Sequence, residues 1–129
     1  MAYILDTHTF LWFVAGDKQL PPAVKDIIKD FDKVCYISIA SFWEITIKLQ
    51  LGKLKSELTL SELFRFAERN QIEIIPINEQ HLITQLNLKF DHKDPFDRII
   101  ISQALSEKLV LITKDKTFKK YKVKQLWGN

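Results

Sequence analysis

The chain has 129 residues, 47% of them hydrophobic, and a formal net charge of +3 at pH 7. This length predicts one domain over residues 1–129, and no apolar run approaches the about 20 residues of a membrane-spanning helix. A single cysteine, Cys35, excludes an internal disulfide, and the N-terminus lacks a signal-peptide pattern, so we expect a cytoplasmic protein with no membrane partner. We interpret Cys35 as a small buried residue of a strand rather than as a nucleophile.

In chain order, short apolar runs alternate with segments of helical periodicity. A strand at residues 3–5 leads into a helix capped by Asp6 or Thr7, and Pro21 and Pro22 open a second helix to about residue 31. The pattern then predicts a strand at 34–37, a helix from 38 or 41 to 51, a helix from 59 or 61 to about 70, a strand at 73–75, a helix at 78–88, a loop at 89–93, a helix from 94, a strand at 109–112 and a candidate edge strand at 122–126. This alternation indicates an α/β fold with a parallel sheet covered on both faces.

Four acids lie near the edge where such a sheet places its working site, beyond the carboxyl ends of the strands. Asp6 directly follows the first strand, and Asp115 follows the fourth after two intervening residues. Glu44 lies in the helix after the second strand, and Asp97 near the start of the helix before the fourth. Their joint placement at one edge predicts a shared site.

Asp97 is the most informative of these acids. At 3.6 residues per turn it shares a face with Ile100, Ile101 and Ala104, the stripe that should turn inward. A buried carboxylate needs a cation, several donors or a metal. The pattern therefore favours a functional role for Asp97.

Each acid also has a structural interpretation. Asp6 can cap a helix, as can Asp94, which we keep outside the set of ligands. Glu44 can pair with the lysine four residues later, Asp97 suits a helix N-terminus, and Asp115 can initiate a turn. These alternatives stay open for each acid taken alone.

Oxygen ligands without a cysteine or histidine cluster suit Mg²⁺, with Mn²⁺ as a substitute, rather than zinc. The three histidines, His8, His81 and His92, are dispersed and match no zinc spacing. Ions of this kind usually serve phosphate chemistry. The acids therefore predict a metal-dependent enzyme acting on phosphate esters.

Positive charge gathers near the C-terminal end of the chain. Six lysines there are interleaved with Phe118 and Tyr121: Lys114, Lys116, Lys119, Lys120, Lys122 and Lys124. Such a run is typical of a nucleic-acid footprint, although more lysine runs of this size are only solvated faces.

Two predicted helices carry more apolar surface than one sheet face can cover. Residues 10–14 are apolar on more than one face of a short helix, and residues 42 and 43 widen the apolar surface of another. Exposed aromatic surface marks interfaces, so we expect a partner contact at Phe10, Trp12, Phe13 and Trp43.

Taken together, the chain resembles PIN-domain ribonucleases, and specifically the toxins of VapBC-type toxin–antitoxin pairs. The similarity covers nearly the whole chain in order. It is carried by residues 3–12 (YILDTHTFLW), 38–45 (SIASFWEI), 48–54 (KLQLGKL), 92–98 (HKDPFDR), 111–115 (LITKD) and 121–127.

This resemblance implies a three-layer α/β/α sandwich with a central, mostly parallel sheet of four to five strands. It implies hydrolysis of RNA by a metal-activated water that leaves a 5′-phosphate and a 3′-hydroxyl. It implies a homodimer and an inhibitory antitoxin. By position, the catalytic and metal-binding residues are Asp6, Glu44, Asp97 and Asp115, with Asp94, Thr113 and Ser38 as accessory residues. Candidates to hold the RNA backbone are Lys48, Arg98, Lys114, Lys116, Lys119 and Lys120.

Two other classes of function remain open. One is a catalytically silent PIN-like binding module. The other is a phosphoaspartyl phosphohydrolase or receiver-like domain with Asp6 as acceptor, although the acid that a haloacid-dehalogenase motif wants two residues later is here His8.

Overall fold

A computed structural model describes residues 1–128 and centres on a five-stranded sheet in the order β3-β2-β1-β4-β5. All four strand pairs are parallel. The strands are β1 Ala2–Leu5, β2 Val34–Ser38, β3 Ile72–Ile75, β4 Val110–Ile112 and β5 Gln125–Leu126. Because β1 is central, the residues that follow it lie between those that follow β2 and β4.

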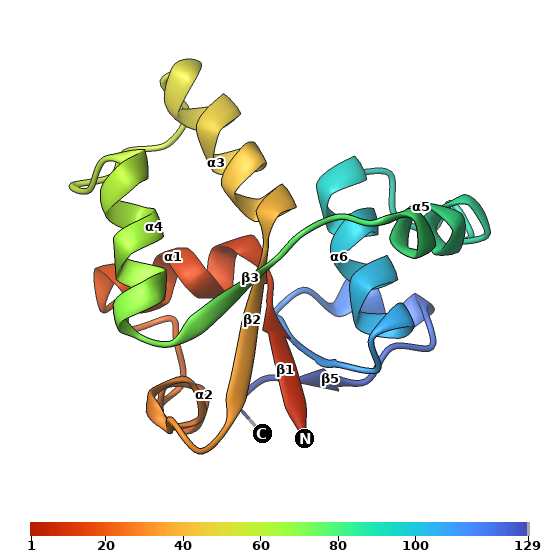
Figure 1. The fold of residues 1–129 in the computed structure, drawn as a ribbon, viewed down its shortest axis with the longest axis horizontal. Helices are drawn as coiled ribbons and strands as arrows, with labels where there is room; N and C mark the ends of the chain where they lie inside the picture. Colours follow the sequence, from red (N-terminus) through yellow and green to blue (C-terminus); the bar gives the residue numbers. More distant parts are fainter. Residues whose placement is uncertain (129) are drawn as a thin grey trace.

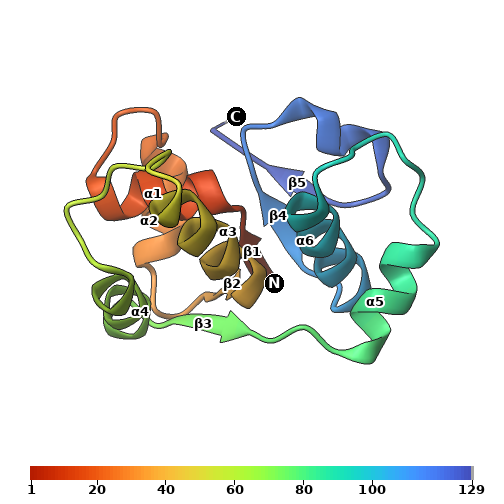
Figure 2. The same cartoon turned by 90° about the horizontal axis from the view of Figure 1, so that it is seen from above.

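Helices cover both faces of the sheet. Figures 1 and 2 show α1 to α4 on one side of the strands and α5 and α6 on the other. Their bounds are α1 Thr7–Ala15, α2 Pro22–Lys29, α3 Ile39–Gln50, α4 Leu60–Arg69, α5 Glu79–Leu86 and α6 Pro95–Ser106. This three-layer α/β/α architecture confirms the predicted fold class.

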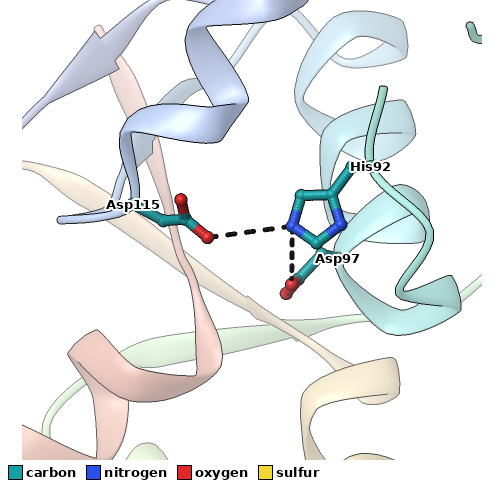
Figure 3. A group of neighbouring side chains, drawn as sticks. All are labelled: His92, Asp97 and Asp115. Atoms are coloured by element: carbon teal, nitrogen blue, oxygen red, sulfur yellow. Dashed lines mark ion pairs between the residues drawn. The ribbon is translucent and has the colours of Figure 1, made fainter. Parts of the chain in front are cut away.

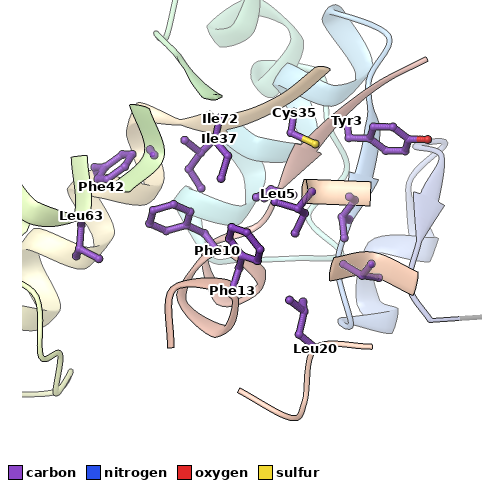
Figure 4. Close-up of a cluster of buried hydrophobic side chains, with 14 of the residues drawn as sticks. Tyr3, Leu5, Phe10, Phe13, Leu20, Cys35, Ile37, Phe42, Leu63 and Ile72 are labelled. Atoms are coloured by element: carbon purple, nitrogen blue, oxygen red, sulfur yellow. The ribbon is translucent and has the colours of Figure 1, made fainter. Parts of the chain in front are cut away.

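Successive residues of a strand point to opposite faces, and this alternation builds two cores. In β1, Tyr3 and Leu5 join the cluster under α1 to α4, which Figure 4 shows, whereas Ile4 packs with α6. In β4, Ile112 joins the first cluster and Leu111 the second. Strands that are buried on both faces explain the continuous apolar runs in the sequence.

The prediction that Phe10 and Phe13 form part of an interface is wrong, because both side chains are in the core. Phe10 is 0% exposed and Phe13 is 8% exposed. Phe66 of α4 packs edge-on against both rings, at centroid distances of 6.3 and 5.7 Å. Helix α1 is therefore covered by α4 as well as by the sheet, which accounts for its second apolar face.

The C-terminal region departs from the predicted pattern. Only Gln125–Leu126 of the expected 122–126 strand is extended, and a 3₁₀ helix, η1 (Lys116–Lys120), follows β4. Cys35 in β2 is 2% exposed, and its burial raises the pKa of the thiol to about 11, in agreement with a structural role. Among residues 1–128, no helix has both the length and the apolar character that crossing a membrane requires.

Candidate functional site

Asp6 lies at the carboxyl end of β1 and caps α1. Its Oδ1 accepts a hydrogen bond from the backbone N–H of Thr9 at 2.8 Å, and its Oδ2 accepts one from the hydroxyl of Thr113. The residue is only 5% exposed, and this burial raises the pKa of the carboxyl group above its ordinary value. The cap that the sequence offered as an alternative is thus present, and the same carboxylate faces the end of β4.

Glu44 lies on the buried side of α3 and is 6% exposed. Its Oε1 accepts a hydrogen bond from the Thr7 hydroxyl at 2.8 Å, and its Oε2 pairs with the Lys48 ammonium at 2.9 Å. The hydroxyl oxygens of Thr7 and Ser41 are 2.9 Å apart. Lys48, predicted to hold RNA, is therefore tied to an acid. From the sequence, Thr7 and Ser41 were considered only as possible helix caps, since nothing in their spacing links α1 to α3.

Asp97 lies in the first turn of α6, and its side chain is 22% exposed. Burial raises the pKa of this carboxyl group to about 8, and the negative charges of neighbouring acids act in the same direction. In decreasing order of effect, these neighbours are Asp94, Glu44, Asp6 and Asp115. Asp97 therefore lies within electrostatic reach of all three other predicted ligands.

Asp115 follows β4 and caps η1. Its Oδ1 accepts hydrogen bonds from the backbone N–H of Thr117 at 2.9 Å and from the Thr117 hydroxyl at 2.7 Å. Partial burial raises the pKa of Asp115, but these hydrogen bonds and the nearby His92 outweigh it, so the net shift is downward. The backbone N–H of Asp115 donates to the Thr113 hydroxyl, which donates to Asp6. Thr113 thus connects two of the acids.

His92 is the residue that the sequence interpretation set aside and the structure brings to the acids. Figure 3 shows Asp97 and Asp115 both approaching one nitrogen of its ring. The Nε2 atom lies 3.1 Å from Oδ2 of Asp97 and 3.7 Å from Oδ2 of Asp115. These three side chains each offer one potential ligand atom, all within 4.8 Å of one another. His92 lies in a loop with no periodic pattern, and its place two residues before the Asp94 cap was the only local signal.

Arg98 does not have the role predicted for it, because its side chain faces the protein. The residue is 5% exposed, and its terminal nitrogens donate to the backbone carbonyls of Gln85, Leu88, Lys89 and His92 at 2.7 to 3.4 Å. Its guanidinium also lies 4.4 Å from the centroid of the Phe90 ring. The structure therefore does not support RNA binding by Arg98, whose donors fix the loop that carries His92.

The accessory residues mainly organise backbone. Asp94 caps α6 through the N–H groups of Phe96 and Asp97. Ser38 is fully buried and caps α3 through the N–H of Ala40 at 3.0 Å. Of the three accessory residues, Thr113 is the one that donates a hydrogen bond to the carboxylate of a predicted ligand, Asp6.

Three of the four remaining lysines predicted to contact RNA line a cavity beside Thr113. Lys114 is exposed, with its ammonium 5.7 Å from the Trp12 ring centroid. Lys114, Lys116 and Lys119 line this cavity of about 270 Å³ together with Gln125. Lys120 is exposed on η1.

The two tryptophans predicted at an interface differ in their surroundings. Trp43 is 59% exposed and packs edge-on against Phe96 at 5.3 Å. Trp12 is partly buried, packs on Trp127 at 5.9 Å, and lines a groove of about 640 Å³ with Leu54 and other residues between α1 and the segment before α4. Both remain candidates for a contact.

The donor set suits a hard divalent cation. Carboxylate oxygens predominate, and a cation beside Asp97 would offset the charges that raise its pKa. Mg²⁺ and Mn²⁺ prefer such oxygen ligands, whereas structural zinc sites are dominated by cysteine and histidine. The residues present therefore fit the metal that the sequence predicted.

A family model described as the PIN domain matches residues 3–124. None of the curated proteins compared with the chain matches it. Similar solved structures include VapBC-1 from nontypeable Haemophilus influenzae, at 21% identity and a TM-score of 0.73, covering 99% of this chain and 98% of that one. VapBC2 from Rickettsia felis, bound to a DNA fragment from their promoter, has 19% identity and a TM-score of 0.73, covering 98% of each chain. DNA-bound VapBC from Salmonella typhimurium has 18% identity and a TM-score of 0.73, covering 98% of this chain and 97% of that one.

Proposed function

The chain belongs to the PIN domain family, and from this premise we propose that it is a Mg²⁺- or Mn²⁺-dependent endoribonuclease, the toxin of a toxin–antitoxin pair in the cytoplasm. Family membership supports nuclease activity in general. The observation that most supports metal dependence is the pKa of Asp97, raised to about 8 by burial and by Asp94, Glu44, Asp6 and Asp115. Acids held this close without a cation repel one another, so the fold keeps an arrangement that a cation stabilises.

In this proposal Asp6, Glu44, Asp97 and Asp115 hold the ion. When bound, a divalent ion activates water and stabilises negative charge on the attacked phosphate. Thr113 orients Asp6 and Asp115 by hydrogen bonds, and Thr7 orients Glu44. Water activated in this way would attack phosphorus, and the bond to the 3′-oxygen would break. That oxygen would leave with a proton from the water as a 3′-hydroxyl, and the other fragment would keep the 5′-phosphate.

The exposed lysines beside the cavity at Thr113 are suited to binding the phosphates of the RNA backbone. Lys114, Lys116 and Lys119 line that cavity together with Thr113, and the Thr113 hydroxyl donates a hydrogen bond to Asp6. Ammonium groups bind phosphates through charge without reading sequence. The phosphoaspartyl alternative is less well supported, because both carboxylate oxygens of Asp6 already accept hydrogen bonds and the residue is 5% exposed.

Cleavage of a labelled RNA in Mg²⁺, in Mn²⁺ and in EDTA tests the activity. We expect cleavage only with metal, and a loss of at least about 100-fold in Asp97→Asn, whose neutral amide binds the ion poorly. Asp91→Asn, which changes an exposed acid of the neighbouring loop in the same way, should cleave normally. Cleavage without metal, or normal cleavage by Asp97→Asn, would contradict the proposal. A folded wild type that is inactive with every metal would favour the catalytically silent binding module.

Metal binding is tested separately by thermal unfolding. Because the ion binds the folded state, millimolar Mn²⁺ should raise the melting temperature of the wild type, by an amount equivalent to about 3 kcal/mol at 100 times its dissociation constant. Asp97→Asn should fold and respond less. A wild-type melting temperature indifferent to Mn²⁺ counts against the metal site, and an unfolded Asp97→Asn would show that this carboxylate is structural.

An antitoxin is the proposed partner, because the chains of similar fold come from VapBC complexes. The groove beside Trp12 and the exposed ring of Trp43 are the proposed contacts for the antitoxin or a second copy. Expression of this chain alone should arrest growth, and co-purification should recover a protein encoded beside it. Trp12→Ala should weaken that complex or the dimer, and a harmless monomer that binds no neighbour would refute the toxin assignment.

A further inference from the structure

His92 is held against the acids by contacts at both its backbone and its ring. Its backbone N–H donates to the Tyr121 hydroxyl at 2.8 Å, and its carbonyl accepts from Arg98 at 3.2 Å. Its ring packs on Phe118 at a centroid distance of 5.2 Å, and its side chain is 15% exposed. The direction in which its imidazole points is therefore set by its surroundings.

The hydrogen bonds of the imidazole assign its proton. Nδ1 accepts a hydrogen bond from the backbone N–H of Asp94 at 3.3 Å, so the lone pair of Nδ1 faces a donor. In a neutral ring the other nitrogen then carries the hydrogen. Nε2 is therefore the protonated nitrogen, and it faces both acids (Figure 3), at 3.1 Å from Oδ2 of Asp97 and 3.7 Å from Oδ2 of Asp115.

We propose that His92 is a positioning residue for the metal centre, whose Nε2–H edge attracts the carboxylates of both Asp97 and Asp115 and keeps them within reach of one ion. The inference rests on the proposed function. Oxygen ligands of one Mg²⁺, at about 2.1 Å from it, lie about 3 to 4 Å apart. The potential ligand atoms of this group already lie within 4.8 Å of one another.

A donor is needed here because the two carboxylates come from distant segments and repel each other. Asp97 belongs to α6, whereas Asp115 follows β4, and the charge of Asp115 is among those that raise the pKa of Asp97. Residues that hydrogen-bond to metal ligands typically change metal affinity or activity by about 10- to 100-fold when mutated. Direct ligation by Nε2 would instead require the ring proton on Nδ1, opposite the Asp94 N–H, and would break that hydrogen bond.

Titration calorimetry of the full chain with Mn²⁺ tests the role of His92. His92→Ala should bind Mn²⁺ about 10- to 100-fold more weakly, and His92→Gln, which keeps an N–H donor near the Nε2 position, should recover part of that affinity. His8→Ala is the matched control, because His8 is exposed and its ring lies tilted against Trp12 at a centroid distance of 5.8 Å. Equal affinity of the wild type and His92→Ala, or no recovery by glutamine, would overturn the inference.

Two spectroscopic measurements distinguish a donor from a ligand and from a residue with a merely structural role. Imidazole ¹⁵N NMR of the metal-free wild type should identify His92 as the Nε2–H tautomer, and an Nδ1–H tautomer would overturn the assignment. Pulsed EPR of the Mn²⁺-loaded wild type should show no directly bound histidine nitrogen, and a directly bound one would overturn it. A wild type that binds no Mn²⁺ would refute the proposed function and this inference together, whereas unchanged binding by His92→Ala would refute only the inference.

Discussion

The two sides of the site are built differently. On one side, which we call the hydroxyl side, Asp6 and Glu44 accept hydrogen bonds from buried threonines, and both acids are at most 6% exposed. On the other, the loop side, Asp97 and Asp115 flank His92, whose loop is fixed by Arg98 and Tyr121.

This difference indicates which acid of the loop side would gain most from a bound cation. On the hydroxyl side, Thr7 is placed by the packing of α1 on the sheet, and Thr113 is placed by β4, which it directly follows. On the loop side the hydrogen bonds of Asp115 hold its pKa below the ordinary range, whereas burial raises the pKa of Asp97 to about 8. Within the loop side, the electrostatic cost of the metal-free arrangement therefore falls on Asp97 rather than on Asp115.

The largest expected effect is a pH dependence of stability that Asp97 introduces. Its pKa is about 8 when folded and ordinarily 3.8, so the folded protein binds this proton more tightly than the unfolded chain. The free energy of unfolding of the metal-free protein should then fall, through this group, as pH rises from about 4 to about 8. Asp97→Asn lacks this dependence. Its free energy of unfolding, measured with urea, should therefore rise relative to that of the wild type by several kcal/mol between about pH 4 and about pH 8, and should rise no further above about pH 8. A difference in the free energy of unfolding that stays constant across these pH values would show that the pKa of Asp97 is not raised in the folded protein.

The next largest effect should come from removing the Arg98 side chain, which would disrupt the loop side and leave the hydroxyl side intact. Arg98→Ala removes the donors for four backbone carbonyls, and we expect the free energy of unfolding to fall by about 3 kcal/mol or more. Lys93→Ala, an exposed cation of the same loop, is the control and should change stability little. Denaturant unfolding measures both, and a fall below about 1 kcal/mol for Arg98→Ala would mean that water replaces its hydrogen bonds.

A smaller effect should follow from Thr7→Val on the hydroxyl side. This change keeps the shape of the side chain but removes the hydroxyl that donates to Glu44, for an expected destabilisation of about 1 to 2 kcal/mol. Thr46→Val is the matched control, because Thr46 is exposed on the same helix as Glu44. Unfolding curves for the two variants, compared at one pH, measure the difference. Equal destabilisation would show that the buried hydroxyl contributes nothing beyond the control.

The smallest expected effect concerns substrate binding beside the loop side. Replacing Lys119 and Lys120 with Ala should weaken binding of all RNA sequences and reduce the slope of log affinity against log salt by about 1 for each phosphate that the protein no longer neutralises. Binding is measured with Asp97→Asn, so that cleavage does not interfere. An unchanged slope would make these lysines a solvated face.

Periodicity was sufficient to predict the parallel sheet, the helices and their caps, because those features depend on near neighbours. Asp94 before Pro95, for example, specifies the start of α6 by itself. The role of His92 could not be predicted, since its position depends on Tyr121, 29 residues away in sequence. Arg98 was misread for a similar reason: its sequence neighbour Asp97 faces the acids, but the guanidinium faces the loop before α6. The interface prediction for Phe10 and Phe13 failed because no local pattern reveals that α4 covers α1.

The hydrogen bond from Thr113 to Asp6 also has a consequence for the order of folding. It joins residues 107 apart in sequence, and the Thr9 hydroxyl donates to the Ile112 carbonyl across 103 residues. Closing so long a loop costs entropy before any contact rewards it, and parallel pairings of this kind form slowly. Asp6 and Asp115 thus come together only when β4 joins β1, so the acid cluster is not assembled in a chain that has not completed this step.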